Sequence, residues 1–524
     1  MALAFGSSLA SKVYLGATEI NLAYFGATQV YSSAAFSAEA QNYFDRLDTA
    51  GDTTYVDYKQ PLANYIDGLV ALGGAYWDTM ESAASFVGVG IQGITVPLRA
   101  GMQVLTNNNF VDTDLNQLTG LVGNGSTKYI NANVTDSDTL QDDVSMSCWV
   151  STATLVNNAV YMGTTRIGMQ STTAAFAPKI KSRSTSTNQV NVSPTVLENF
   201  FGQTRTNSAN FDYLINGASG TATRTSLVAV TEDVGVFNLG SSVGVYSPAR
   251  LATYHYGPAL TLATIEALQA TLLSEVVAAK AAAAAENYFS RLAAAGDTTH
   301  VAYKQPLTNY ISSLVTLGGA YWDDMVSACS FVGVGIQGIT VPLRAGMASA
   351  TNVNNNFVAA DLDVLTGLKG DGATKYIDTG ALSNTLAFNN HSLSVYLTAD
   401  RELGGNRYIS GFNSKLTVLG NTSGFRARSA SATLYALGSS TAVGELVGIS
   451  RDNSADFDWS YETSGTQLNT STDLGNVTSI KVFGDEAGNN KTAARLATYH
   501  IGLAINLATL EALQDTLITE IAAI

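Results

Sequence analysis

The sequence predicts a mainly β fold with helices: an N-terminal β-ribbon segment followed by two tandem homologous units, each a helical segment and a jelly-roll β-sandwich closed by a C-terminal helix. A stretch of 64 residues recurs 245 positions later with 50 identities. Many short strand-like runs follow each copy. Only 13% of residues are charged, where ~25% is usual, because Asn, Ser, Thr and Gly fill the predicted turns. Length alone allows about three domains, but the repeat indicates two large units.

Residues 1–35 contain a smaller repeat of period ten, in which aromatic and branched residues flank a Gly-Ala-Thr centre. Its two copies predict short strands that reverse at Gly16 and at Gly26. Two such ribbons cannot bury enough surface to fold alone. We therefore expect this segment to depend on a partner or on an oligomer.

The repeat defines a first unit of residues 36–280 and a second of residues 281–524. Apolar residues between Leu62 and Val70 recur at helical spacing, Pro61 suits a first turn, and the glycine pair at 73–74 supplies a stop. Farther along, runs of about six residues, such as 144–150 and 392–397, alternate with polar turns. Short strands at this spacing predict a sandwich or jelly roll.

Each unit is expected to end in a helix, which begins at Thr261 in the first copy and at Asn506 in the second. The first of these helices meets no breaker before Gly296, so the pattern predicts one alanine-rich helix from about Thr261 to Ala294 that joins the units. Such a connection is stiffer than a Gly/Ser linker. Two cysteines fall in a predicted strand and a predicted helix, and we interpret both as buried small hydrophobic residues without a disulfide. They are Cys148 and Cys329.

Three motifs recur in the same order in both sandwich halves: a strand that runs from 204 to an Asn216-Gly217 turn, a following strand at 236–240, and a closing strand and helix at 251–268. The second copy keeps 450–459 in register but replaces the turn by residues 462–465. This arrangement resembles concanavalin A-like, laminin-G type domains of lectins and glucanases. The resemblance covers roughly residues 105–275 and 350–524 and implies lectin-like sandwiches.

A second resemblance covers the whole chain. The repeat at 12–30, and the unit that follows it with Tyr58-Lys59, Gly74-Ala-Tyr-Trp77 and the run 120–129, are similar to anchoring segments and modules of tailed-bacteriophage virion proteins. This implies a tail-fibre or receptor-binding protein that attaches to other virion proteins through residues 1–35, forms a homotrimer and displays its sandwiches for adhesion to host-surface polysaccharide. The N-terminus lacks a signal-peptide pattern, as expected for a virion assembled in the host cytoplasm. The alternative is a head decoration or capsid fibre protein with a structural role and no specific ligand.

Charge and hydropathy argue against two classes of partner. The 27 basic and 42 acidic residues leave a net charge of −15, which has the wrong sign for binding nucleic acid. The longest apolar run, residues 86–98, is shorter than the ~20 residues that span a bilayer. We expect no nucleic acid and no membrane insertion.

The sequence also argues against catalysis. Related glucanases carry Glu-x-Asp-x-(x)-Glu on one strand, whereas the glutamates of these sandwiches stand singly. They are Glu198, Glu232, Glu402, Glu445, Glu462 and Glu486. A dense acidic loop at 136–143 is a conceivable Ca²⁺ site, but its counterpart at 383–391 has no carboxylate, which favours a solvated loop. His255 and His500 occupy equivalent strand positions and are expected to be structural. We therefore expect no enzyme activity, no metal and no cofactor.

Sugar recognition needs aromatic faces beside carboxylate and amide groups. The equivalent strands at 211–216 and 457–459 supply these groups, and the candidate ligand-binding residues are Asp212, Tyr213, Asn216, Asp458 and Trp459. Half of an alternating strand faces the core, so packing is the alternative for each aromatic. The helical halves are far more alike than the sandwiches. Either the sandwich loops diverged toward different ligands, or recombination between the copies was uneven.

Overall fold

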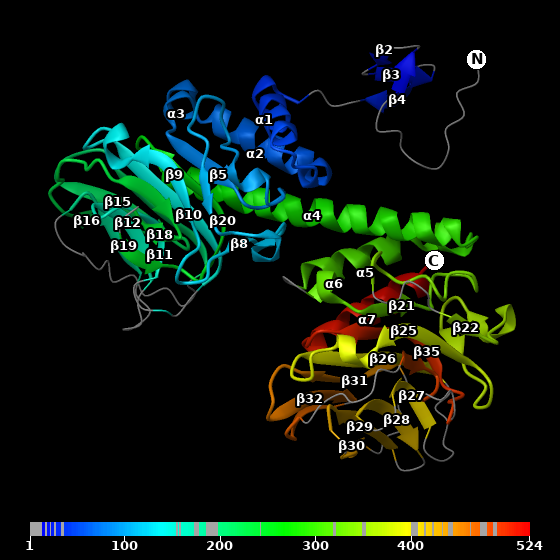
Figure 1. The fold of residues 1–524 in the computed structure, drawn as a ribbon. Coiled ribbons are helices and arrows are strands. Elements are labelled where there is room, and N and C mark those ends of the chain that lie inside the picture. Colours follow the sequence, from blue (N-terminus) through cyan, green and yellow to red (C-terminus); the bar gives the residue numbers. More distant parts are fainter. Residues whose placement is uncertain are drawn as a thin grey trace. The chain divides into compact units, whose positions relative to one another are not determined.

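The computed structural model divides the chain into two units, Met1–Val276 and Val277–Ile524, each described by itself. It describes residues 13–15, 18–20, 22–25, 28–32, 36–153, 156, 159–171, 178–184, 198–240, 243–317, 321–347, 353–399, 407–412, 415–421, 424–431, 433–438, 444–461, 463–471, 479–485 and 490–524. The chain is mainly β with a few helices, in two similar sandwich-like halves (Figure 1).

Two antiparallel hairpins lie in the N-terminal segment. Strand β1 (Val13–Leu15) pairs with β2 (Thr18–Ile20), and β3 (Leu22–Phe25) pairs with β4 (Thr28–Ser32). The pairing confirms the predicted ribbons, while the glycines at the expected reversals lie outside the described residues.

Two sheets form the sandwich of the first unit. The larger sheet has the order β16 (Ala218–Thr223), β15 (Asn210–Ile215), β14 (Asn199–Arg205), β10 (Val144–Thr152), β20 (Arg250–Gly257), β8 (Gly120–Val122) and β7 (Leu115–Asn116), with β5 (Ser82–Ser85) also paired to β20. The smaller sheet has the order β13 (Lys179–Ser182), β12 (Ile167–Gln170), β11 (Val160–Gly163), β17 (Asp233–Val236), β9 (Tyr129–Thr135) and β6 (Thr106–Asn108). A short ribbon of β18 (Asn238–Leu239) and β19 (Val243–Tyr246) adjoins it. All of the pairings are antiparallel.

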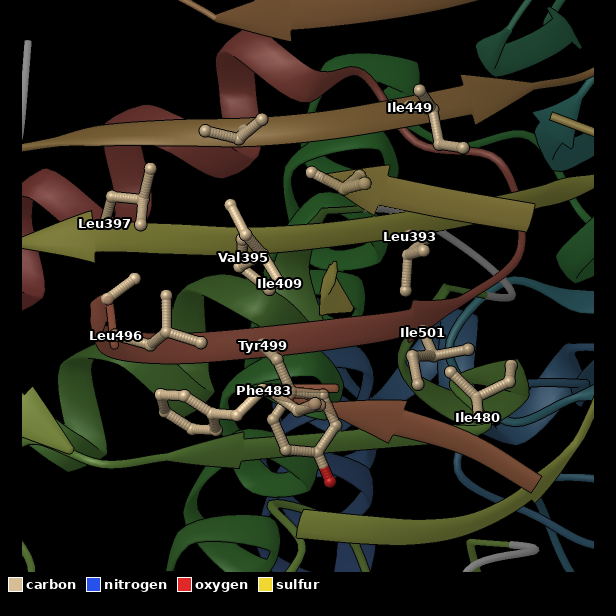
Figure 2. Packing of buried hydrophobic residues seen from close by; sticks show 14 of the residues in the cluster. Leu393, Val395, Leu397, Ile409, Ile449, Ile480, Phe483, Leu496, Tyr499 and Ile501 are labelled. Atoms are coloured by element: carbon tan, nitrogen blue, oxygen red, sulfur yellow. The ribbon is translucent and has the colours of Figure 1, made fainter. Parts of the chain in front are cut away.

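The second unit repeats this topology. Its larger sheet has the order β23 (Leu362–Asp363), β24 (Gly367–Lys369), β35 (Arg495–Gly502), β26 (His391–Ala399), β31 (Glu445–Arg451), β32 (Asp456–Tyr461) and β33 (Thr463–Leu468), with β21 (Ser327–Ser330) paired to β35. Its smaller sheet has the order β22 (Val353–Asn355), β25 (Tyr376–Leu382), β34 (Ser479–Val482), β27 (Arg407–Phe412), β28 (Leu416–Asn421), β29 (Gly424–Ser429) and β30 (Tyr435–Gly438). Residues that alternate along these strands fill the space between the two sheets (Figure 2). Leu393, Val395 and Leu397 of β26 all point into this core.

Helices form a third layer in each unit. In the first unit these are α1 (Ala38–Thr49), α2 (Lys59–Ala71) and α3 (Gly74–Thr79); in the second they are α5 (Lys304–Thr316), α6 (Tyr321–Asp324) and α7 (Leu507–Ala522). The predicted helix at 62–70 is confirmed, with Pro61 in its first turn. The Asn506 side chain accepts a hydrogen bond from the Thr509 amide at 3.1 Å, which confirms the predicted cap of α7.

Helix α4 (Leu262–Ala294) is continuous, as the alanine-rich pattern predicts. Its first half packs in the first unit, where Ile265, Leu272 and Val276 are buried, and its second half packs in the second, where Tyr288 and Leu292 are buried. By length and composition it is also the one described helix that could cross a membrane. Only 28% of its most apolar 18-residue window is buried, and alanines make up much of its length.

A buried polar cluster joins the helical layer to the larger sheet in each unit. The hydroxyl of Tyr65 on α2 is 2.5 Å from His255 Nε2 on β20, and Tyr310 is 2.6 Å from His500 Nε2. Both histidines are fully buried. They face the helices because their neighbours on the strand, such as Tyr254 and Tyr499, face the other sheet.

The near-identical segment after β5 is a buried scaffold. Asp52 Oδ2 accepts the Gly90 amide at 2.8 Å, and Asp297 Oδ2 accepts the Gly335 amide at 2.7 Å. The Arg46 guanidinium donates to the carbonyl of Leu98 at 2.9 Å. Hydrogen bonds therefore hold this segment in place from both sides.

Substituting Gly93 by alanine should destabilise the first unit by ~1–3 kcal/mol through overpacking. The added Cβ would lie 2.1 Å from Oδ2 of the buried Asp52, which its own hydrogen bonds hold in place. Urea unfolding measures the loss. G68A is the control, because its Cβ meets only the flexible end of Leu268 and the second unit carries Ser313 at the same position. Equal stability of G93A and the parent would show that this scaffold is not rigid.

Two features differ from the sequence-based expectations. Cys329 lies in strand β21 rather than in a helix, because the small residues 327–330 fit beside β35. Both cysteines are buried, and neither forms a disulfide. The acidic loop at 136–143 is not simply solvated, since Asp136 is fully buried.

Asp136 forms a buried ion pair with Arg183. The Nε of Arg183 lies 3.0 Å from Asp136 Oδ1, and both side chains have no exposed surface. Nη2 of Arg183 also donates to Thr139 Oγ1 at 2.5 Å, and the Tyr256 hydroxyl donates to the Asp136 carbonyl at 3.1 Å. In the second unit Ser383, Leu386, Ala430 and Ile501 occupy the four equivalent positions. The same fold therefore holds an ionic cluster in one unit and a largely apolar one in the other.

Candidate functional site

A cleft of ≈ 830 Å³ lies in the first unit between the β15–β16 hairpin and the start of α4. Its apolar floor includes Leu214, Leu260 and Leu262, and hydroxyl groups of Thr and Ser surround this floor. The lining residues are Thr204, Thr206, Asp212, Tyr213, Leu214, Gly217, Ser219, Gly220, Thr221, Ala259, Leu260, Thr261, Leu262, Ala263 and Glu266. Apolar surface ringed by hydrogen-bonding groups matches the two kinds of surface on a pyranose.

Local hydrogen bonds hold the walls of the cleft. Asp212 Oδ1 accepts the Thr221 hydroxyl at 2.6 Å across the hairpin. Glu266 Oε1, on the first turns of α4, accepts the Gly217 amide at 3.1 Å. Thr204 Oγ1 accepts the Leu260 amide at 3.1 Å. The hairpin, β14 and the helix start are thus fastened to one another around the opening.

The hairpin itself follows from its sequence. Ile215 pairs with Ala218, so the two residues between them make the turn. Asn216 and Gly217 both have positive φ, at 47° and 75°, as a type I′ turn requires. The predicted Asn-Gly turn is confirmed.

Asp212 and Tyr213 are neighbours on β15, so their side chains point to opposite faces of the sheet. Asp212 pairs with Thr204 and is exposed on the face toward α4. The Tyr213 ring lies over Gly220, where an added Cβ would be 2.2 Å from the phenol oxygen. Both residues border the cleft, but they do not form one aromatic-carboxylate face. Asn216 lies in the turn, and its Oδ1 accepts the Asn199 side-chain amide at 2.9 Å.

The second unit has the same strand arrangement. Asp458 Oδ1 accepts the Thr466 hydroxyl at 2.7 Å. Trp459 packs against the core, with its ring over Gly465. Glu511, which is equivalent to Glu266, instead accepts the Leu446 amide at 3.2 Å and the Ser460 hydroxyl at 3.3 Å. Ser460 stands where the first unit has Leu214, whereas Ile505 and Leu507 correspond to Leu260 and Leu262, so the apolar floor is only partly repeated.

Other residues of the first cleft are not evident from the sequence. Ser219, Thr221 and Glu266 lie on elements that the sequence predicts, but no pattern shows that these elements meet. Glu402, Glu462 and Glu486 lie outside the described residues.

A second cleft of ≈ 710 Å³ adjoins the first, because Ala259 lines both. It lies between the end of α3 and the loop at 136–143, and its lining residues are Leu72, Gly73, Tyr76, Thr79, Glu81, Asp138, Thr139, Leu140, Asp143, Pro258 and Ala259. Partial burial, and then the nearby Asp138, raise the pKa of Glu81, although Arg99 opposes this. The carboxylates of this cleft are Glu81, Asp138 and Asp143. The equivalent residues of the second unit are not acidic: they are Val326, Thr385 and Asn390. Among the described residues no group of His, Cys, Asp and Glu is placed to hold a metal ion.

The histidines are buried parts of the framework. Burial lowers the pKa of His255 to about 3 and that of His500 to about 3. Burial also lowers the pKa of His391 to about 4; the Ala387 carbonyl opposes this shift and Arg451 adds to it. These side chains are held neutral inside the fold and face no cleft described above.

Comparison with known proteins assigns this chain to no family. No protein-family model matches the sequence, and no curated protein matches it. Among solved structures, the chain is similar to domain 4 of an extracellular arabinanase from Geobacillus stearothermophilus in complex with arabinotriose, with 13% identity and a TM-score of 0.25 over 36% of this chain and 98% of that domain. It is also similar to Trypanosoma rangeli sialidase, with 8% identity and a TM-score of 0.28 over 72% of this chain and 62% of that one.

The binding domain of botulinum neurotoxin serotype D is a third similar structure, with 8% identity and a TM-score of 0.29 over 82% of this chain and 98% of that domain. These proteins overturn one expectation. A sequence interpreted as non-enzymatic matches structures of two glycan-processing enzymes, so the exclusion of catalysis was wrong. At such TM-scores the matches assign no activity to this chain.

Proposed function

We propose that this chain is a structural protein of a tailed-bacteriophage virion, of the tail-fibre or receptor-binding type, and that its first sandwich binds cell-surface polysaccharide in the cleft beside the β15–β16 hairpin. The cleft is the observation that supports binding. It combines the apolar floor at Leu214 and Leu262 with hydroxyl and carboxylate groups at its rim. A sugar ring can bury one face on such a floor while its hydroxyls donate to the rim.

The N-terminal hairpins support the virion assignment. Isolated two-stranded ribbons are marginally stable in water, so β1–β2 and β3–β4 would gain stability from contacts with other virion proteins or within a homotrimer. The resemblance of residues 12–30 to virion anchoring segments gives the same assignment.

Filling the cleft should abolish binding. Ser219 is exposed on β16 and lines the cleft, so a tryptophan there would occupy the sugar position while the paired strands remain. We expect S219W to lose at least about tenfold in affinity for host envelope polysaccharide, measured by glycan array and by adsorption of the purified full chain to host cells.

Two variants control this experiment. V56W adds the same side chain at an exposed site in the helical layer, where Val56 is 53% exposed, and should bind as the parent does. S464W, at the position equivalent to Ser219, measures any share of the second unit. Undiminished binding by S219W would reject the cleft as the site. Failure of the parent to bind any envelope fraction would favour the purely structural virion role, and released oligosaccharide would reveal hydrolysis.

A further inference from the structure

In both clefts of the first unit, all of the charged lining residues are carboxylates. The lining of the first carries the carboxylates Asp212 and Glu266, and that of the second carries Glu81, Asp138 and Asp143. Neither lining includes a lysine, arginine or histidine. A ligand in the first cleft would therefore meet negative charge and no compensating cation from the lining residues.

These negative charges are fixed in place. Asp212 and Glu266 are each held through one oxygen, by the Thr221 hydroxyl and the Gly217 amide. Asp143 Oδ1 accepts the Ala259 amide at 2.7 Å, at the residue that both clefts share. A carboxylate that is anchored by the fold cannot swing away from an approaching anion. Its repulsion therefore lowers the affinity for acidic ligands. A ligand with a neutral hydroxyl or an ammonium group can instead donate a hydrogen bond to the carboxylate.

We propose that Asp212 and Glu266 are specificity-determining residues that select non-acidic glycans, with neutral or amino sugars accepted and carboxylate- or phosphate-bearing sugars rejected. This inference rests on the proposed function, because it assigns a ligand class to the same cleft. The net charge of −15 adds long-range repulsion of the same sign.

The test is a binding profile over bacterial surface polysaccharides sorted by charge. The parent should bind only neutral or amine-bearing polymers. The variant D212N/E266Q keeps the oxygen that accepts from Thr221 and from Gly217 but removes both charges, so we expect at least a tenfold gain for acidic polymers that share a backbone with a bound neutral one.

A matched variant separates local from long-range charge. E39Q/D57N removes the same two charges from exposed positions in the helical layer, outside both clefts. It should keep the parent's rejection of acidic polymers. An equal gain in this control would show that net charge alone discriminates and would overturn the assignment.

The two proposals fail in different ways. If the parent binds nothing, the proposed function fails. If the parent binds acidic polymers as well as neutral ones and S219W abolishes both, the cleft is the site but the charge selection is wrong.

Discussion

Replacing Arg183 by alanine should destabilise the first unit by about 3–5 kcal/mol, the cost of leaving one partner of a buried ion pair uncompensated. Asp136 would remain without exposed surface and without its cation. Thr139 would also lose a donor. The backbone adds little to this cost, because Ala430 occupies the equivalent position with nearly the same φ, 47° against 44°.

The second unit supplies the control. Exchanging the whole cluster for its counterpart, as D136S/T139L/R183A/Y256I, removes both charges together. Since well-packed apolar groups can replace a buried ion pair at little or no cost, we expect this variant to recover most of the stability that R183A loses. Urea unfolding followed by tryptophan fluorescence compares the three proteins, with Trp77 and Trp149 reporting on the first unit and Trp322 and Trp459 on the second. If R183A alone were neutral, the pair would contribute nothing, and if the combined variant were as unstable as R183A, local packing would dominate instead.

Acidification should destabilise both units, and the second unit more steeply. A histidine held neutral by burial has a lower pKa in the folded state, so the unfolded chain binds its proton first. The stability that these neutral histidines contribute is therefore fully present above pH 6.5. It is lost as the pH falls toward the folded-state pKa, which is about 4 for His391 and about 3 for His255 and His500. At pH 4.5 each of these histidines lowers the free energy of unfolding by ~2–3 kcal/mol, since one pH unit corresponds to about 1.36 kcal/mol.

The units differ because His391 replaces the Val144 of the first unit. The variant H391V should flatten the pH dependence of the second unit toward that of the first, while Ser429 keeps the Arg451 Nε donor at 3.1 Å. Melting temperatures from pH 7.5 to 4.5 measure the slopes, and carboxylate titration cancels between variant and parent. Identical slopes in H391V and the parent would contradict the buried neutral state of His391.

Local patterns account for the parts of the fold that could be predicted. The helical spacing before Gly73, the unbroken alanine run after Thr261 and the Asn216-Gly217 turn each specify one element, and the structure has all three. The repeat gives the existence of two similar sandwiches.

Contacts between distant residues account for what was missed. Arg183 lies 47 residues from Asp136, so the acidic loop appears solvated when only its neighbours in sequence are considered. In the same way, Glu266 meets the hairpin 49 residues earlier, and this contact helps to form the cleft wall. Aromatic and acidic residues follow one another directly along the candidate strand, but alternation places consecutive residues on opposite faces of the sheet. The site therefore depends on how strands and helices pack against one another, and the periodicity of the sequence does not predict that packing.

The continuous helix α4 also affects how far local unfolding extends through the protein. Between Val276 and Ala281 no residue of α4 is buried, yet the helical ladder continues through these positions. Loss of order in the second unit would remove the contacts of Tyr288 and Leu292 but leave Ile265, Leu272 and Val276 packed. Opening would then proceed as fraying from the free end of the helix and stop where the buried side chains of the first unit begin. The second sandwich can therefore unfold locally while the first sandwich, with its half of α4, stays folded.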